Sequence, residues 1–234
     1  MLDQLLDYTQ NLDIQTFFVL LILIALEAVL SADNAIALAA IAQGLEGPKL
    51  QRDALNMGLL AAYVLRITLI LTATWVVQFW QFELIGAAYL LWLVFNYFTS
   101  DDDQEHHYHH SLGFSSLWQA IPMIAVTDLA FSLDSVTTAI AVADQTWLII
   151  SGGTIGVITL RFLAGLFIRW LDEFTHLEDA GFITVGFVGL RLLLRVINRN
   201  LVPPEWLMIT AIVVMFVWGF SERKKPETSN EGED

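Results

Sequence analysis

The stretch Glu27-Ala-Val-Leu-Ser-Ala-Asp-Asn-Ala-Ile-Ala-Leu-Ala-Ala-Ile-Ala42 places two acids inside an otherwise apolar segment. It recurs 101 residues later as Asp128-Leu-Ala-Phe-Ser-Leu-Asp-Ser-Val-Thr-Thr-Ala-Ile-Ala-Val-Ala143. In both copies an acid, a serine, a second aspartate and a small polar residue occupy matching positions. Because self-similarity at a fixed offset indicates repeated structural units, the two copies predict a chain built from two related halves.

The acid motifs lie in two of seven apolar runs, at residues 15–43, 54–79, 82–99, 115–143, 147–170, 180–197 and 206–221. Only 15% of the chain is charged, against about 25% in a typical soluble domain. Most runs approach or exceed the roughly 20 residues that cross a bilayer as a helix. Continuous apolar runs favour helices over the alternating strands of a barrel. We therefore expect an all-α, polytopic membrane protein of about seven transmembrane helices.

A second correspondence supports duplication of three helices. Gly58 and Arg66 in the second run are spaced like Gly153 and Arg161 in the fifth, and a weaker match joins the third and sixth runs. Three is an odd number, so the two copies must cross the membrane in opposite directions. Inverted repeats of this kind are a transporter architecture, with the binding site between the repeats near the midplane.

The repeat gives a domain organisation in which the seventh helix stands apart. We expect a short N-terminal segment at 1–14, repeat one at 15–99, an acidic and histidine-rich loop at 100–114, repeat two at 115–197, the last helix at 198–221 and a charged, disordered tail at 222–234.

The cationic residues of the connecting segments predict the orientation. Lys49, Arg52, Arg169, Arg223, Lys224 and Lys225 all fall on one side, whereas the other side has mainly Arg195 and Arg199, with Arg191 near the helix end. The positive-inside rule then places the N-terminus outside and the C-terminus in the cytoplasm. We expect a plasma (inner) membrane, although the sequence leaves an internal membrane such as a thylakoid open.

Glu27, Asp33, Asp128 and Asp134 lie well inside the apolar runs, and Arg66 and Arg161 lie near the centres of the second and fifth runs. Each isolated charge at the bilayer centre costs roughly 2.5–3.5 kcal/mol on insertion scales. Such groups must therefore be paired, neutralised or hydrated. Four acids and two arginines leave two negative charges, which one divalent cation would cancel.

Helical geometry separates the acids into two sets. Ser31 and Asn34 follow Glu27 by four and seven residues and share its stripe, and Ser132 and Ser135 repeat that pattern after Asp128. Asp33 and Asp134 point about 120° away on an ideal helix. They would join the stripes only through local unwinding, for which neither motif has a Gly or Pro, or they serve a different role.

Oxygen ligands of these kinds suit hard cations such as manganese, magnesium or calcium. We expect Arg66 and Arg161 to be counter-ions that support the site rather than contact its substrate. An alternative is that acids and arginines pair as structural contacts without any ion. Ser31 and Ser132 would then bond back to helix carbonyls.

The two acid motifs resemble those of the TerC family of membrane proteins, and Leu177-Glu-Asp-Ala-Gly-Phe182 is similar to a later signature of that family. The resemblance covers about residues 15–221. It implies manganese export and kinship with the LysE-type transporter superfamily, although the family was named for tellurium resistance. The intramembrane acids of the family correspond to Glu27, Asp33, Asn34, Asp128 and Asp134 here.

The loop between the repeats contains four histidines, His106, His107, His109 and His110, beside four acids. Such a segment can collect metal ions. The simpler interpretation is a solvated link between the two repeats.

Composition excludes several other functions. A net charge of -14 argues against nucleic-acid binding, and the absence of cysteine excludes thiolate metal sites and disulfides. No nucleotide-binding motif is present, so transport would draw on an ion gradient or the membrane potential, with proton coupling chemically natural. We expect no enzymatic activity and no cofactor, with the divalent cation as substrate. Three alternatives stay open: a membrane scaffold, a transporter of another cation such as calcium, and, remotely, an aspartyl protease using Asp33 and Asp134.

Overall fold

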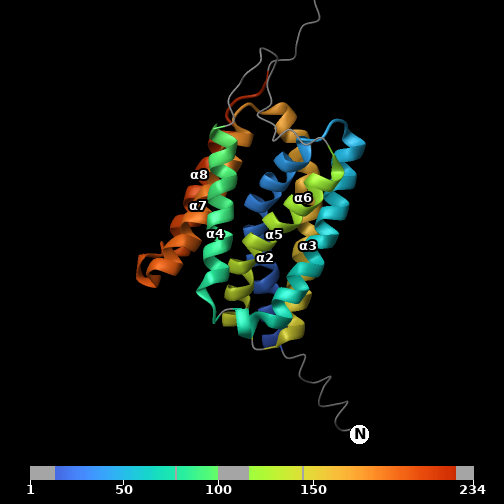
Figure 1. Cartoon of the computed structure of the whole chain (residues 1–234). Helices are drawn as coiled ribbons and strands as arrows, with labels where there is room; N and C mark the ends of the chain where they lie inside the picture. The colour runs from blue at the N-terminus through green and yellow to red at the C-terminus, as the bar shows by residue number, and fades with distance from the viewer. Residues whose placement is uncertain (1–13, 77, 100–115, 144, 225–234) are drawn as a thin grey trace, which may run out of the picture.

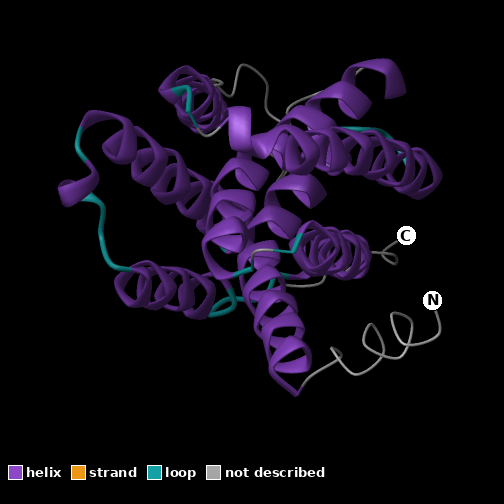
Figure 2. Cartoon of the chain, turned by 90° about the horizontal axis from the view of Figure 1, so that it is seen from below, coloured by secondary structure: helices purple, strands orange, loops and turns teal. Residues whose placement is uncertain are grey.

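A computed structural model describes residues 14–76, 78–99, 116–143 and 145–224, and a few helix side chains, including that of Asp33, are not described. The helices are α2 (Ile14–Gln43), α3 (Pro48–Val76), α4 (Trp80–Thr99), α5 (Leu117–Val142), α6 (Thr146–Glu173), α7 (Leu177–Ile197), the short 3-10 helix η1 (Arg199–Leu201) and α8 (Glu205–Gly219). Within these ranges the only extended pairing is an isolated bridge between Phe174 and Arg223. Figure 2 shows helix and loop throughout the described chain. The expected all-α fold is confirmed.

The helix boundaries follow the apolar runs, with one clear extension. α3 begins at Pro48, six residues before the apolar run that predicts it. Gly47, at φ 93°, adopts the left-handed conformation that glycine tolerates, and proline suits the first helical position because its N–H would have no partner there. The tight turn therefore adds a polar first segment to α3.

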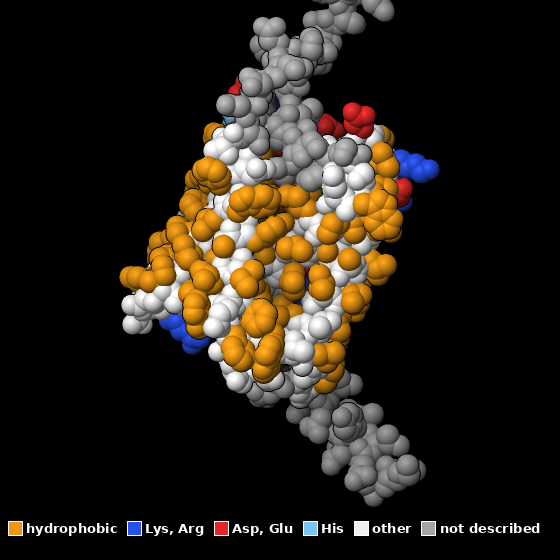
Figure 3. All heavy atoms as spheres, viewed as in Figure 1, with side chains coloured by type: hydrophobic (Ala, Val, Ile, Leu, Met, Phe, Trp, Pro, Cys, Tyr) orange, Lys and Arg blue, Asp and Glu red, His pale blue; other side chains and the backbone are white. Residues whose placement is uncertain are grey.

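Five described helices are long and apolar enough to cross a membrane: α3, α4, α5, α6 and α7. Large apolar side chains are exposed around the bundle, among them Trp118, Phe162 and Leu60, and Figure 3 shows hydrophobic side chains along the visible flank. A surface of this kind requires lipid around it. The chain is thus an integral membrane protein. With 15 residues, α8 is about 22 Å long, which is shorter than the roughly 30 Å hydrocarbon core.

Helix packing is reciprocal between the two predicted repeats. α2 packs most extensively against α6, and its counterpart α5 packs equally extensively against α3, the counterpart of α6. α4 packs against its own counterpart α7, and α2 meets α5. In Figure 1, α2 rises from the N-terminal end whereas α5 descends, with both between the α4–α7 pair and the α3–α6 side. This arrangement fits an inverted repeat.

Single side chains show the same reciprocity. A Cβ added at Gly152 of α6 would lie 3.3 Å from Cβ of Leu23 in α2. A Cβ added at Gly58 of α3 would lie 2.8 Å from Cβ of Ile124 in α5. Leu23 and Ile124 are separated by the same 101 residues as the two acid motifs. Each half therefore inserts an aliphatic side chain against a glycine of the other, and this contact brings the acid motifs to the centre of the bundle.

Candidate functional site

One guanidinium joins the first acids of the two motifs. Arg66 on α3 donates through Nη1 to Oε1 of Glu27 on α2, and its Nη2 lies 3.0 Å from Oδ1 of Asp128 on α5. All three side chains are buried. The duplicated acids, 101 residues apart in sequence, thus share one cationic group across the interface between the two halves.

A glycine of α6 makes room for this cluster. A Cβ added at Gly156 would lie only 2.1 Å from Cγ of Glu27, whereas one at Gly153 would make an ordinary contact of 3.7 Å with Cδ of Arg66. Since real side chains do not approach to 2.1 Å, only glycine at position 156 permits the observed rotamer of Glu27. The sequence of α6 is therefore fitted to the acid on α2.

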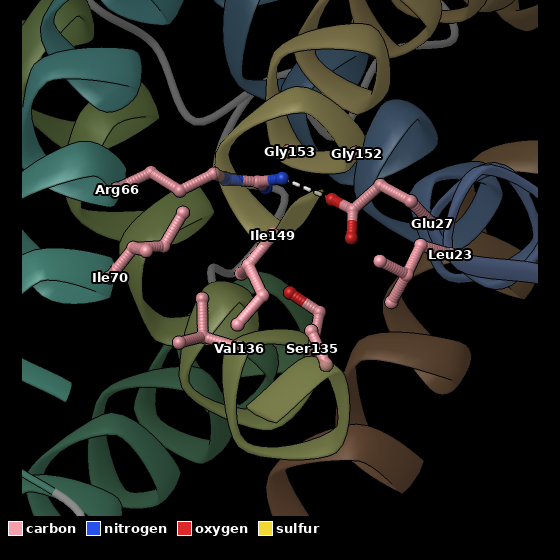
Figure 4. A pocket seen from close by; sticks show the side chains of 10 residues that line it. Leu23, Glu27, Arg66, Ile70, Ser135, Val136, Ile149, Gly152 and Gly153 are labelled. Carbon is pink, nitrogen blue, oxygen red and sulfur yellow. Dashed lines mark hydrogen bonds and ion pairs between the residues drawn. The ribbon is translucent and has the colours of Figure 1, made fainter. Parts of the chain in front are cut away.

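A small cavity adjoins the cluster, with a volume of about 20 Å³. Glu27, Arg66 and Ser135 are its polar lining, and aliphatic side chains, including those of Leu23 and Ile149, form the rest. Figure 4 shows Glu27 and Arg66 pointing toward one another, with the hydroxyl of Ser135 directed into the same space. Roughly 10–15 Å³ holds one water molecule, so the cavity has room for a single water or ion.

The predicted polar stripes are buried along the centre of the bundle. Ser31 and Asn34 accompany Glu27 on α2, and Ser132 accompanies Asp128 on α5. Ser132 donates from Oγ to the backbone oxygen of Asp128 at 2.7 Å, which is the local bonding expected of a buried helical serine. Oγ of Ser31 has no hydrogen-bond partner among the described residues. This hydroxyl can therefore bind a water molecule or an ion.

Asp134 belongs to a different group of charges. Its two carboxylate oxygens accept from Nη1 of Arg191 and Nη2 of Arg195, both on α7, and Nη1 of Arg195 lies 3.8 Å from Oε1 of Glu83 on α4. α5 is continuous through its motif, so no unwinding turns Asp134 toward Asp128. Of the two possibilities that the sequence left open, the structure shows the second: the acids have different partners.

Arg161 departs from the expected symmetry with Arg66. Its Nε donates to Oδ1 of Asn56 at 2.6 Å, and no described carboxylate forms an ion pair with it. The prediction that Arg161 is a counter-ion of the intramembrane acids is therefore wrong in this structure. The matched spacing from Gly58 to Arg66 and from Gly153 to Arg161 reflects the duplication, but only one copy faces the acids.

Two sets of predicted residues cannot be placed. Asp33 lies in α2, but its side chain is not described, and His106, His107, His109 and His110 lie outside the described residues. Among the residues that are described, no group of three or more histidine, cysteine, aspartate or glutamate side chains could hold a metal ion. The described ligands of the central cluster are two carboxylates with nearby hydroxyl groups.

Sequence reasoning missed the residues that neutralise Asp134. The sequence predicts Arg191 and Arg195 only as orientation signals near the membrane boundary, and it predicts no role for Glu83. The spacing of the two arginines was a usable signal, because residues four apart share a helix face and the segment around them is apolar. Two such cations inside an apolar run require an intramembrane acid.

Comparison with known proteins decides the family. The profile described as "Integral membrane protein TerC family" matches residues 12–226. The chain belongs to the TerC family. No solved structure matches it significantly.

Several bacterial and plant TerC-type proteins are similar to the chain. YceF of Bacillus subtilis, an uncharacterized membrane protein, is 32% identical over 176 residues, which cover 73% of this chain and 68% of YceF. YkoY of the same organism, also uncharacterized, is 34% identical over 194 residues, 76% of this chain and 60% of YkoY. The chloroplastic thylakoid membrane protein TERC of Arabidopsis thaliana is 25% identical over 198 residues, 72% of this chain and 52% of TERC. The TerC region thus makes up between about half and two thirds of these relatives.

Proposed function

We propose that this TerC protein exports a divalent metal ion across the membrane, with Mn²⁺ as its main substrate. The observation that carries the proposal is the bridge made by Arg66, since carboxylates from both repeats already bind one cationic group between them. A site that holds a guanidinium through two carboxylates also has the charge and the oxygen ligands for a hard divalent cation. Manganese in particular rests on the resemblance of the acid motifs.

The charge around the cluster favours a cation. Asp134 and Glu83 form ion pairs with Arg191 and Arg195 in a separate group. Arg66 remains as the one described cation beside the first acids of the motifs. Glu27 and Asp128 carry one negative charge in excess of Arg66 when both acids are ionised. α4, the counterpart of α7, contains no Lys or Arg that could offset this charge.

In this proposal Arg66 is a tethered competitor of the metal ion. An arriving cation takes the carboxylate oxygens of Glu27 and Asp128, and the guanidinium moves aside until the ion leaves. The acids lie on different halves of the bundle, so relative motion of the halves exposes them to one side of the membrane and then the other. Protons that occupy the carboxylates in exchange for metal would couple transport to a pH gradient.

The proposal includes a location. We place the protein in the plasma (inner) membrane with its N-terminus outside and C-terminus in the cytoplasm, as the distribution of Lys and Arg predicts. No catalytic activity or cofactor is part of the proposal.

Metal flux into inverted membrane vesicles tests the proposal. We expect Mn²⁺ uptake that responds to an imposed pH gradient and exceeds uptake of Mg²⁺, Ca²⁺ and Zn²⁺. Glu27→Gln and Asp128→Asn should each reduce it at least about tenfold, because each removes a charged ligand. Glu46→Gln, an acid-to-amide change at an exposed position, is the matched control. Wild-type vesicles that move no divalent ion, or acid variants that transport normally while correctly folded, would refute the proposal.

A non-transporting membrane scaffold is the second candidate. It is favoured by the observation that Glu27 and Asp128 are both ion-paired and that the adjoining cavity holds no more than one small species. A scaffold predicts that the two acid variants lose thermal stability, while wild-type vesicles show no metal-dependent flux. Measuring melting temperature and flux on the same preparations separates the two functions.

A further inference from the structure

A second pocket, which shares no lining residue with the central cavity, lies between the beginning of α3 and the end of α6. Its volume is about 600 Å³. Its polar lining consists of Gln51 and Arg52 on α3 and of Arg161, Arg169 and Asp172 on α6. On each helix the lining residues recur at spacings of three or four, so the pocket is formed by one face of each helix.

The pocket concentrates positive charge in an acidic protein. The chain has only 11 Lys and Arg against 25 Asp and Glu, yet three of these cations line one pocket. None of the three arginines is ion-paired within the part of the chain that the structure describes. Asp172, the one acid in the lining, accepts a hydrogen bond from Nε2 of Gln43 at 2.9 Å. Three arginines against one aspartate therefore leave the lining with an excess of positive charge.

Arg161 is held in place within this pocket. Its Nε donates to Asn56 at 2.6 Å, which anchors the guanidinium and leaves its terminal nitrogens available. A Cβ added at Gly165 would lie 3.1 Å from Nη1 of Arg161. The side chain thus lies along α6 toward Arg169, over a glycine that gives it room. This geometry presents a planar donor group to the pocket, and such a group can donate two hydrogen bonds to one phosphate.

The same pocket has an apolar wall that faces lipid. Leu55, Phe162 and Leu166 line it beside the arginines, and Phe162 is 76% exposed. Arg161 is twelve residues before the end of α6, or about 18 Å along the helix axis, so the charged wall reaches below the helix ends. Figure 3 shows that hydrophobic side chains cover the adjoining flank of the bundle.

We propose that this pocket binds an anionic phospholipid. The phosphate lies against Arg52, Arg161 and Arg169, and the acyl chains follow Phe162 and Leu166 into the bilayer. A free anion would leave the apolar wall unused, whereas a phospholipid matches both surfaces. Basic pockets between transmembrane helices are a known way to hold acidic headgroups. The expected orientation places the lipid in the cytoplasmic leaflet.

Native mass spectrometry of the purified protein in detergent tests the assignment. Phosphatidylglycerol, phosphatidylcholine with the same acyl chains, or inorganic phosphate is added separately. We expect the wild type to retain phosphatidylglycerol, at least tenfold more than phosphatidylcholine. Arg161→Gln and Arg169→Gln should lose that preference. Lys49→Gln, which removes an exposed charge near the pocket without lining it, should keep it.

A further variant changes the shape of the pocket without changing its charge. Gly165→Leu leaves all three arginines in place but fills the space beside Arg161, so it should also lose bound phosphatidylglycerol. Equal retention of both lipids by the wild type would overturn the proposal without any variant. The proposal would also be overturned if folded Arg161→Gln and Arg169→Gln retained as much phosphatidylglycerol as the wild type. Displacement of the lipid by millimolar phosphate would assign the pocket to a soluble anion instead.

Discussion

At the residue scale, the buried charged residues form two groups that differ in their ratio of acids to arginines. Arg66 serves two acids, Glu27 and Asp128, and this group carries excess negative charge when both acids are ionised. Asp134 has the opposite arrangement, because two arginines bind its two oxygens. The first group has more acids than arginines, whereas in the second group two arginines bind one carboxylate. We therefore assign substrate binding to the first group and structural stability to the second.

Asp134→Asn tests this division. The substitution removes the carboxylate that Arg191 and Arg195 both bind, and removal of one partner from a buried pair costs about 3–5 kcal/mol. For a chain of this length that corresponds to a melting temperature lower by on the order of 10 °C. Thermal unfolding in detergent measures it.

The matched control for Asp134→Asn is Glu173→Gln at the exposed end of α6, which should leave the melting temperature unchanged. An Asp134→Asn variant that melts like the wild type yet loses metal flux would place Asp134 in the substrate site instead.

The sequence could predict which acids are buried, but not which cations meet them. Glu27 and Asp128 are identified by the repeat, and their stripes with Ser31 and Ser132 follow from helical spacing. The pairing of Asp134 on α5 with Arg191 on α7 is a long-range packing outcome, and the spacing of the two arginines indicates a buried acid without showing which one. For the same reason Arg161 was expected at the centre, although it faces Asn56 and a peripheral pocket.

At the element scale, close approach of α2 and α6 sets the position of Glu27. The pair is the most extensively packed in the described bundle, together with α3 and α5. Gly152 and Gly156 form the contact surface on α6 that faces α2, where small residues let helices approach closely in lipid. The sequence shows that these glycines lie in an apolar run. Which one receives the acid became visible only in the structure.

Gly156→Ala should disturb the site through this contact. The added Cβ would stand 2.1 Å from Cγ of Glu27, so the acid must leave its rotamer and its bond to Arg66 weakens. Overpacking of this kind costs typically about 1–3 kcal/mol. We expect a lower melting temperature and reduced metal flux.

Gly186→Ala is the matched control for Gly156→Ala, since the nearest atom to its added Cβ, on Val94, is 3.7 Å away. It should be neutral or slightly stabilising, because alanine favours helix by about 1 kcal/mol over glycine. If Gly156→Ala behaves like Gly186→Ala in both measurements, α6 does not fix the position of Glu27.

At the scale of the whole molecule, the two halves exchange helices, so that neither forms a compact unit alone. α2 of the first half packs on α6 of the second, and α5 of the second packs on α3 of the first. The repeat in sequence predicted two oppositely directed copies but not this exchange, since sequence similarity gives no contacts between copies. The exchange matters for function, because any relative motion of the helices that carry Glu27 and Asp128 also moves their glycine partners.

Paired cysteines test the exchange of helices directly, because the natural chain contains no cysteine that could interfere. Leu23→Cys with Gly152→Cys, and Ile124→Cys with Gly58→Cys, would place their Cβ atoms 3.3 and 2.8 Å apart. Disulfides need a separation of about 3.5–4.5 Å, which a helix shift of about an ångström supplies. Both pairs should therefore cross-link under mild oxidation, as seen by a shift in non-reducing electrophoresis.

Leu23→Cys with Gly58→Cys provides the control for this cross-linking. Leu23 lines the central cavity together with Ile70 of α3, and Gly58 precedes Ile70 by twelve residues, or about 18 Å along that helix. A disulfide cannot bridge this distance, so the crossed pair should stay reduced. Cross-linking of the crossed pair in place of the two matched pairs would mean that each half folds on itself, and Glu27 and Asp128 would then no longer meet at Arg66.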